Sequence, residues 1–130
     1  MQNIIIDTDI GDDIDDALAL ALSLNSNELN ILGISTVFKN TPLRTKLLSN
    51  LLKVYKREDI PVVSGIGKPI VNNVNIDEIP CQCTDLICPS EGINTAVTDF
   101  YSEILSKNKA IILAIGPLTN IAKVIKEAPY

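Results

Sequence analysis

Short β-branched apolar runs alternate with longer helix-forming segments along this sequence, and that alternation restricts the fold more than any other feature. The predicted strands are 3–6, 29–38, 60–63 and 110–115, and the predicted helices are 14–24, 42–55, 95–106 and a last one that follows 116–120 and ends near 127. Strands joined by helices pair in parallel through right-handed crossovers. The sequence therefore predicts an α/β fold, Rossmann-like, with an open, mostly parallel sheet and helices on both faces.

Two apolar segments are expected to be buried in this fold. Residues 17–22 alternate Ala and Leu, which could mimic a strand, but both are strong helix formers and poor strand formers. The helix 14–24 is therefore expected to be apolar nearly all round and buried. The strand 110–115 is expected to be buried too. A chain of 130 residues is enough for a single α/β domain, residues 1–130.

Chemistry-bearing residues follow three of the predicted strands. An Asp cluster follows the first strand, Lys39-Asn40 follow the second, and Gly116-Pro117 follow the fourth. Ligands of open parallel sheets bind at the carboxyl ends of the strands. We therefore expect these three segments to meet at one edge. Within the last turn, Thr119 or Asn120 is expected to cap the final helix.

Six aspartates lie within ten residues of the chain: Asp7, Asp9, Asp12, Asp13, Asp15 and Asp16. Helix capping and the helix dipole explain two or three of them. The remainder repel one another, and the first cation in the sequence is Lys39, so the cluster favours a bound hard divalent cation. A loop residue, Asp9, can converge with Asp12, Asp15 and Asp16, which have helix-face spacing. The EF-hand pattern fails, because Gly11 occupies a ligand position.

The charge balance excludes some classes of partner. The net charge is −5, and a nucleic-acid-binding surface would be basic. Apolar runs are too short to cross a bilayer, so no membrane partner is expected. There is no Lys or Arg before Ile4, so the start does not resemble a secretory signal, and a cytoplasmic location is expected.

Three segments carry a resemblance to a known family. IIIDTDIGDDIDDALALAL, STVFKN and LAIGPLTNIA occur in that order between Asn3 and Ala122. Together they resemble the inosine–uridine-preferring nucleoside hydrolase family. The resemblance implies the nucleoside hydrolase fold and an N-ribosyl hydrolase with a tightly bound Ca²⁺. It also implies a family chain that continues well beyond Tyr130, so these residues are expected to be the N-terminal part of a longer fold.

The resemblance also implies roles for individual residues. Asp9 would be both a Ca²⁺ ligand and the general base that activates water. Asp16 would be a second Ca²⁺ ligand, and the main-chain carbonyl of Ile115 a third. Asp15 and Asn40 would bind ribose hydroxyls. The implied reaction is hydrolysis of the N-glycosidic bond of a ribonucleoside to ribose and free base, in purine or pyrimidine salvage, by a homo-oligomer.

The sequence departs from the family pattern in two places within the chain. The interval from Asp9 to Asp15 is two residues longer than in the short form of the motif, which leaves the roles of Asp12 and Asp13 open. The family's histidine-bearing loop reads CQCTDLICPSEG here. Its cysteines, Cys81, Cys83 and Cys88, make an incomplete zinc site and are expected to be reduced thiols in a loop.

Two other functions remain open at the level of sequence. A hydrophobic strand that runs into Asp-x-Asp is also typical of haloacid-dehalogenase-like magnesium phosphohydrolases, with Asp7 as nucleophile. Against this, Ile10-Gly11 stand where that motif has a residue followed by Thr or Val. The second alternative is a truncated, non-catalytic metal-binding or interaction module of the nucleoside hydrolase fold.

Overall fold

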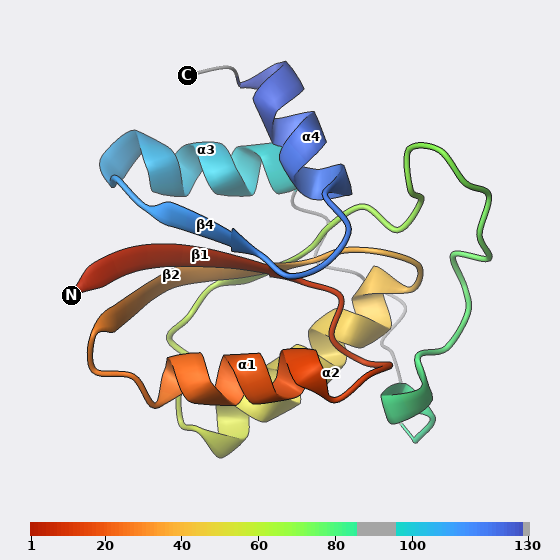
Figure 1. The fold of residues 1–130 in the computed structure, drawn as a ribbon, viewed down its shortest axis with the longest axis horizontal. Coiled ribbons are helices and arrows are strands. Elements are labelled where there is room, and N and C mark those ends of the chain that lie inside the picture. The colour runs from red at the N-terminus through yellow and green to blue at the C-terminus, as the bar shows by residue number, and fades with distance from the viewer. Residues whose placement is uncertain (86–95, 129–130) are drawn as a thin grey trace.

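The computed structural model describes residues 1–85 and 96–128, and its centre is a four-stranded parallel sheet (Figure 1). The strands are β1 (Gln2–Thr8), β2 (Leu29–Thr36), β3 (Val62–Ser64) and β4 (Ile111–Ala114), in the order β3-β2-β1-β4. The helices are α1 (Asp15–Leu24), α2 (Thr41–Val54), α3 (Val97–Lys107) and α4 (Thr119–Glu127). The predicted α/β class is confirmed. Every described strand pair is parallel.

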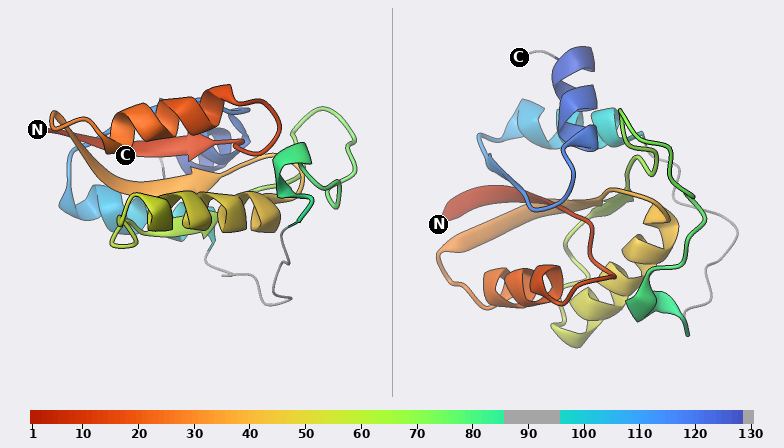
Figure 2. Two further views of the ribbon diagram at one scale, coloured as in Figure 1. Left: turned by 90° about the horizontal axis from the view of Figure 1, so that it is seen from below. Right: turned by 45° about the vertical axis from the view of Figure 1, so that its right-hand side comes forward.

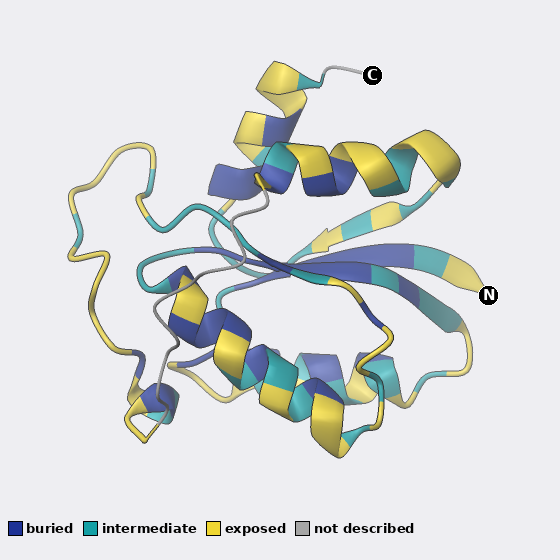
Figure 3. Ribbon diagram, turned by 180° about the vertical axis from the view of Figure 1, so that it is seen from behind, coloured by how far each residue is buried: buried dark blue, intermediate teal, exposed yellow. Residues whose placement is uncertain are grey.

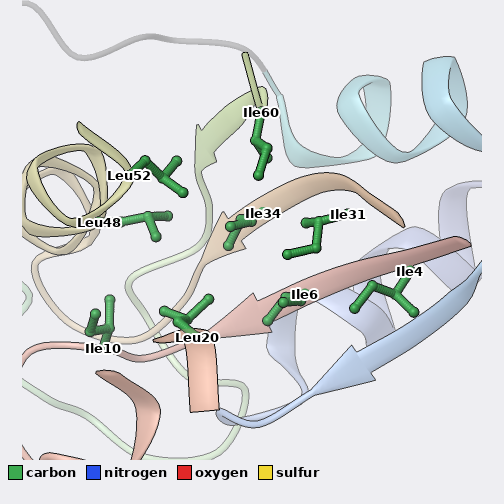
Figure 4. Packing of buried hydrophobic residues seen from close by; sticks show 9 residues of the cluster. All are labelled: Ile4, Ile6, Ile10, Leu20, Ile31, Ile34, Leu48, Leu52 and Ile60. Carbon is green, nitrogen blue, oxygen red and sulfur yellow. The ribbon is translucent and has the colours of Figure 1, made fainter. Parts of the chain in front are cut away.

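The helices form a layer on each face of the sheet (Figures 1 and 2). Side chains alternate along β1, so Ile4 and Ile6 face α1 and α2 while Ile5 faces α3 and α4. The first core is shown in Figure 4 and contains Ile4, Ile6, Ile10, Leu20, Ile31, Ile34, Leu48, Leu52 and Ile60. The second contains Ile5, Val63, Val97, Phe100, Tyr101 and Val124. The strands β1 and β2 are thus covered on both faces.

The α1 helix is not buried on every side, which corrects the prediction for residues 14–24. Leu20 is fully buried against the sheet, but Leu18 is 61% and Leu22 75% exposed. A helix lying on a sheet buries only the stripe that faces the strands, whatever its outer residues are. Leu18 and Leu22 fall on the opposite side of the helix, together with Ile14, which is 62% exposed.

The β4 strand is likewise less buried than predicted, because it lies at an edge of the described sheet. Ile112 packs into the second core, whereas Ile111 is 56% and Leu113 39% exposed. In Figure 3, β4 is coloured as exposed and half-buried, whereas most of the neighbouring strand β1 is coloured as buried. Its described hydrogen-bonding partner is β1 alone.

The ends of the predicted elements differ from the observed ones for identifiable reasons. The second strand ends at Thr36 instead of residue 38, because Phe38 and Lys39 have positive φ angles of 76° and 57°. The predicted irregular stretch 68–92 contains a short 3-10 helix, η1 (Cys81–Cys83). Cys88 and Thr95 lie outside the described residues. No helix in the described part of the chain is long and apolar enough to cross a membrane.

Candidate metal and substrate site

The loops after β1, β2 and β4 meet at the carboxyl edge of the sheet, as predicted. The Val37 amide donates to the Thr8 carbonyl at 3.0 Å, and the Ile115 amide donates to the Asp7 carbonyl at 2.8 Å. Gly116 is packed so closely that an added Cβ would lie 3.0 Å from the Asp9 nitrogen. Only a residue without a side chain lets the loop after β4 come this close to the loop after β1.

An acidic pocket of about 180 Å³ opens at this edge. It is lined by Asp9, Asp12, Asp13, Asp15, Asp16 and Ile115. Four of the five predicted site residues therefore share one pocket. Asn40 is not among the residues that line it. Its Oδ1 accepts the Leu43 amide at 3.3 Å and so caps α2, and its Nδ2 donates to the Asp77 carbonyl at 3.4 Å.

Asp16 is the most firmly held carboxylate of the pocket. It lies in the first turn of α1 and is only 6% exposed. Its Oδ2 accepts hydrogen bonds from the Thr8 hydroxyl at 2.5 Å and from the Asp9 amide at 3.1 Å. Its Oδ1 accepts none from the described residues. The side chain is thus anchored through one oxygen and has the other available for a ligand.

Asp9 lies beside Asp16 in the loop that follows β1. Burial, together with the neighbouring Asp16 carboxylate, raises the pKa of Asp9 to about 6. The Arg44 guanidinium opposes this shift and lowers the pKa of Asp9 in part. Two adjacent carboxylates in a half-buried pocket are a site whose charge a cation would neutralise.

Asp12 has a different surrounding from the one predicted for it. The α1 helix begins at Asp15, so Asp12 precedes it and does not share its face. Its carboxylate instead accepts the Arg44 Nη2 at 2.8 Å and the Cys81 amide at 3.1 Å. Partial burial raises the pKa of Asp12, but these hydrogen bonds and the Arg44 charge outweigh it and hold the pKa below its usual value.

Helix capping does not account for the acidic cluster. The residue at the N-cap of α1 is Ile14, and no side chain caps the helix there. Asp15 and Asp16 in the first turn do complement the helix dipole. Capping would therefore leave the close Asp9–Asp16 pair unexplained.

A buried polar network beneath the pocket was missed by the sequence analysis. Asp7 is fully buried. Its Oδ1 accepts hydrogen bonds from the Ser35 hydroxyl at 2.5 Å and from the side-chain Nδ2 of Asn120 at 2.7 Å. Ser35 in turn is 2.9 Å from the Tyr101 hydroxyl. Asp7 Oδ2 has no hydrogen-bond partner among the described residues. Since Asp7 has no exposed surface, it is not placed to act as the nucleophile of a phosphohydrolase.

Asn120 does not cap the last helix, contrary to the prediction. The N-cap of α4 is Leu118, and no side chain caps it. Asn120 is fully buried, donates to the Thr36 carbonyl at 3.0 Å and accepts the Ile66 amide at 2.9 Å. Together with its bond to Asp7, these contacts tie α4 to β1, β2 and the segment after β3. The available signal in the sequence was that Asn120 ends the predicted turn and is followed directly by apolar residues, a position at which a polar side chain can be buried.

The short helix η1 packs against the acidic loop, as Figure 1 shows at the tip of the loop after β1. The Gln82 amide donates to the Gly11 carbonyl at 2.8 Å, and the Cys81 thiol contacts the Asp12 carbonyl at 3.1 Å. Cys81 and Cys83 form no disulfide among the described residues, and they lie in η1 and not in an irregular loop. Cys88 lies outside the described residues.

The donor atoms of the pocket suit a hard divalent cation. Asp9 and Asp16 offer carboxylate oxygens, and Ile115 lines the same pocket. Ca²⁺ takes about 6–8 oxygen ligands, so this set would supply part of a coordination shell. In residues 1–85 and 96–128, no three His, Cys, Asp or Glu side chains are grouped closely enough to hold a metal ion unaided.

The fold and the site define a parallel α/β protein with an oxygen-donor pocket at the carboxyl edge of its sheet. The sequence model of the inosine-uridine preferring nucleoside hydrolase family matches residues 4–130. The chain belongs to this family.

Individual relatives and solved structures agree with this assignment. The chain is 33% identical to the probable uridine nucleosidase 2 of Arabidopsis thaliana, over 98% of this chain and 43% of the relative. It is 34% identical to the pyrimidine-specific ribonucleoside hydrolase RihA of Salmonella dublin, over 97% of this chain and 43% of the relative. The structure of the plant nucleoside hydrolase PpNRh1 matches with a TM-score of 0.79 and 29% identity, over 98% of this chain and 43% of that structure's chain. The chain thus spans less than half the length of the relatives it matches.

Proposed function

We propose that this chain forms the metal-binding part of an enzyme that hydrolyses the N-glycosidic bond of ribonucleosides, releasing ribose and the free base. The observation that carries the proposal is the pocket shared by Asp9, Asp15, Asp16 and Ile115. Membership of the nucleoside hydrolase family supports it, as do relatives named as uridine and pyrimidine ribonucleoside hydrolases. A ribonucleoside is accordingly the proposed substrate.

Asp9 is the proposed general base. A base works best when its pKa is near the working pH, and in the metal-free chain burial beside Asp16 raises the pKa of Asp9 to about 6. The proton would come from the water that attacks C1′ of the ribose. As the glycosidic bond breaks, positive charge develops on the sugar, and the surrounding carboxylates stabilise it.

The remaining pocket residues are assigned to the metal and to the sugar. Asp9, Asp16 and the Ile115 carbonyl would hold a Ca²⁺ ion, and Asp15 would bind a ribose hydroxyl. When bound, such an ion supplies a Lewis acid that lowers the pKa of water. Asn40 is proposed to bind the ribose as well. Within residues 1–85 and 96–128, the one partner of its Nδ2 is the Asp77 carbonyl, at 3.4 Å.

The wider role proposed is salvage of purine or pyrimidine bases in the cytoplasm by a homo-oligomer. Salvage follows from the products, because free base and ribose are both reusable. The homo-oligomer is proposed from the family resemblance alone. A phosphohydrolase is not favoured, since its nucleophile would be the fully buried Asp7.

The test is a chimera in which residues 1–130 replace the matched 43% of the Salmonella RihA chain. Reducing sugar is measured with inosine and uridine, and phosphate release from p-nitrophenyl phosphate is measured in parallel. We expect ribose release that Asp9→Asn lowers by a factor of about 10²–10⁴, the usual contribution of a general base. The exposed Asp59, remote from the pocket in sequence and paired with Arg57, gives the matched control Asp59→Asn.

Two outcomes would contradict the proposal. The first is an Asp9→Asn chimera that releases ribose at the rate of its parent, which makes the base assignment untenable. The second is a folded parent chimera that releases phosphate and no ribose.

A further inference from the structure

A fully buried arginine lies under the acidic loop and was not anticipated from the sequence. Arg44 belongs to the first turns of α2, and its side chain is 0% exposed. Its Nε donates to the Phe38 carbonyl at 2.7 Å, its Nη1 to the carbonyls of Asp9 at 2.6 Å and Ile10 at 3.0 Å, and its Nη2 to the Asp12 carboxylate at 2.8 Å. Three of these four acceptors are main-chain carbonyls. The position of Arg44 is therefore set by its hydrogen bonds to the main chain as well as by its ion pair with Asp12.

The loop is shaped around this guanidinium. Asp9 presents its carbonyl to Arg44 and lines the acidic pocket. Gly11 has a φ of 136°, and a Cβ added there would lie 3.1 Å from Arg44 Nη1 and 2.8 Å from Pro80 Cβ. Glycine is required at this position by both its backbone angle and its space. The planar fork of arginine matches several carbonyls at once, which the single ammonium of lysine does not.

The charge of Arg44 acts against cation binding. A positive group near a bound cation repels it, so electrostatics alone predicts weaker metal binding because Arg44 is present. The same charge offsets the repulsion between the carboxylates of the loop while no metal is bound. The hydrogen bonds also hold the ends of β1 and β2 together, through the carbonyls of Asp9 and Phe38.

We propose that Arg44 is a positioning residue of the cation site, which holds the loop 9–12 in its metal-binding conformation before the metal arrives. The inference rests on the cation site of the proposed function. Preorganisation of the loop outweighs the repulsion between the guanidinium and the metal. Loss of Arg44 therefore weakens cation binding, although it removes a positive charge.

Two substitutions separate position from charge. Arg44→Lys keeps the charge and loses the fork, and Arg44→Met loses both. Each variant is made in the RihA chimera that tests the proposed function and is titrated with Ca²⁺ by isothermal calorimetry beside the unsubstituted chimera. Positioning predicts that both variants bind Ca²⁺ about 10- to 100-fold more weakly, the range found when groups that orient metal ligands are removed. Charge alone predicts unchanged affinity for Arg44→Lys and tighter binding for Arg44→Met.

A control and a second readout exclude a general loss of stability. Arg57→Met removes the same charge from a partly exposed, ion-paired arginine just after α2 and should leave Ca²⁺ affinity unchanged. Hydrogen exchange without metal reports on the loop directly, because the Asp9 amide is bonded to Asp16 and the Ile10 amide to Thr8. Both amides should exchange faster in Arg44→Lys while the amides of β1 do not. If Arg44→Met does not fold, Arg44→Lys decides the question.

The outcomes distinguish this inference from the proposed function. An unsubstituted chimera that binds Ca²⁺, with variants of equal or higher affinity, overturns the role of Arg44 and leaves the metal site standing. A folded, unsubstituted chimera that binds no Ca²⁺ at millimolar concentration overturns the metal site and, with it, any role of Arg44 toward the metal. Weaker binding by both variants, with faster exchange confined to the loop, supports the inference.

Discussion

At the scale of single residues, the carboxylates of the site differ in the hydrogen bonds that they accept. Asp16 is anchored by Thr8 and the Asp9 amide, and Asp12 by Arg44. Among the described residues no side chain donates a comparable hydrogen bond to Asp9, and burial beside Asp16 raises its pKa to about 6. Among the carboxylates that line the pocket, Asp9 is thus the one proposed to exchange a proton.

The raised pKa of Asp9 predicts a specific pH dependence. The folded chain binds a proton at Asp9 more tightly than the unfolded chain, whose pKa is near 3.8. This group therefore destabilises the metal-free fold above pH 6, and its cost fades as the pH falls toward 4. Because protons and Ca²⁺ compete for the same carboxylate, the rise in Tm caused by millimolar Ca²⁺ should be largest above pH 6 and should shrink below it.

Thermal melts from pH 4.5 to 8, with and without Ca²⁺, measure this effect. Asp9→Asn is the control, because burial also raises the pKa of Asp7 and adds a dependence of the same sign. The difference between wild type and Asp9→Asn isolates the contribution of Asp9. A Ca²⁺-induced shift of equal size at pH 5 and pH 7.5 would contradict the prediction.

At the scale of elements, the edge is held together by side chains that cross between strands and helices. Asn120 connects α4 with β1, β2 and the segment after β3 through three hydrogen bonds. Arg44 connects α2 with the ends of β1 and β2. The backbone between the strands is therefore positioned by buried polar groups as well as by apolar packing.

Replacing Asn120 by Ala should weaken the whole edge. The substitution leaves the Asp7 carboxylate with fewer partners and the Ile66 amide without its acceptor. Each buried polar group that loses its partner costs about 1–3 kcal/mol, so we expect the free energy of unfolding to fall by roughly 2–4 kcal/mol. Urea denaturation followed by circular dichroism gives this value. Asn50→Ala, at an exposed position of α2, is the matched control, and a similar effect of both substitutions would contradict the argument.

At the scale of the whole molecule, the described chain exposes apolar surface of a kind that folded proteins usually cover. Ile14, Leu18 and Leu22 form a stripe on the outer side of α1, each more than 60% exposed. Ile111 and Leu113 are exposed on β4, whose outer edge has no described strand beside it. An unpaired strand edge is a template for pairing with another chain.

The isolated 130-residue chain should therefore associate, and it should not release ribose. Size-exclusion chromatography with light scattering measures the association. Leu18→Lys with Leu22→Lys should shift the chain toward the monomer, while Val54→Lys, at a residue that is 78% exposed on α2, should not. Catalysis is expected to fail, because the pocket supplies only part of a cation shell and positioning of the sugar needs more groups. A monomer that releases ribose from inosine or uridine would contradict both expectations.

The sequence by itself determined the local structure and the edge at which chemistry-bearing residues meet. β-branched runs and Ala/Leu-rich segments have strong local preferences, and parallel topology brings strand ends to one side, so the Asp cluster and the segment after the last strand were expected at one edge. The tertiary structure alone decided which polar groups pair. Nothing near Arg44 or Asn120 in the chain reveals their acceptors, which lie on other elements. The tertiary structure also decided which apolar residues stay exposed. Leu18 and Ile111 are as apolar as core residues, and only their neighbours in space determine their burial.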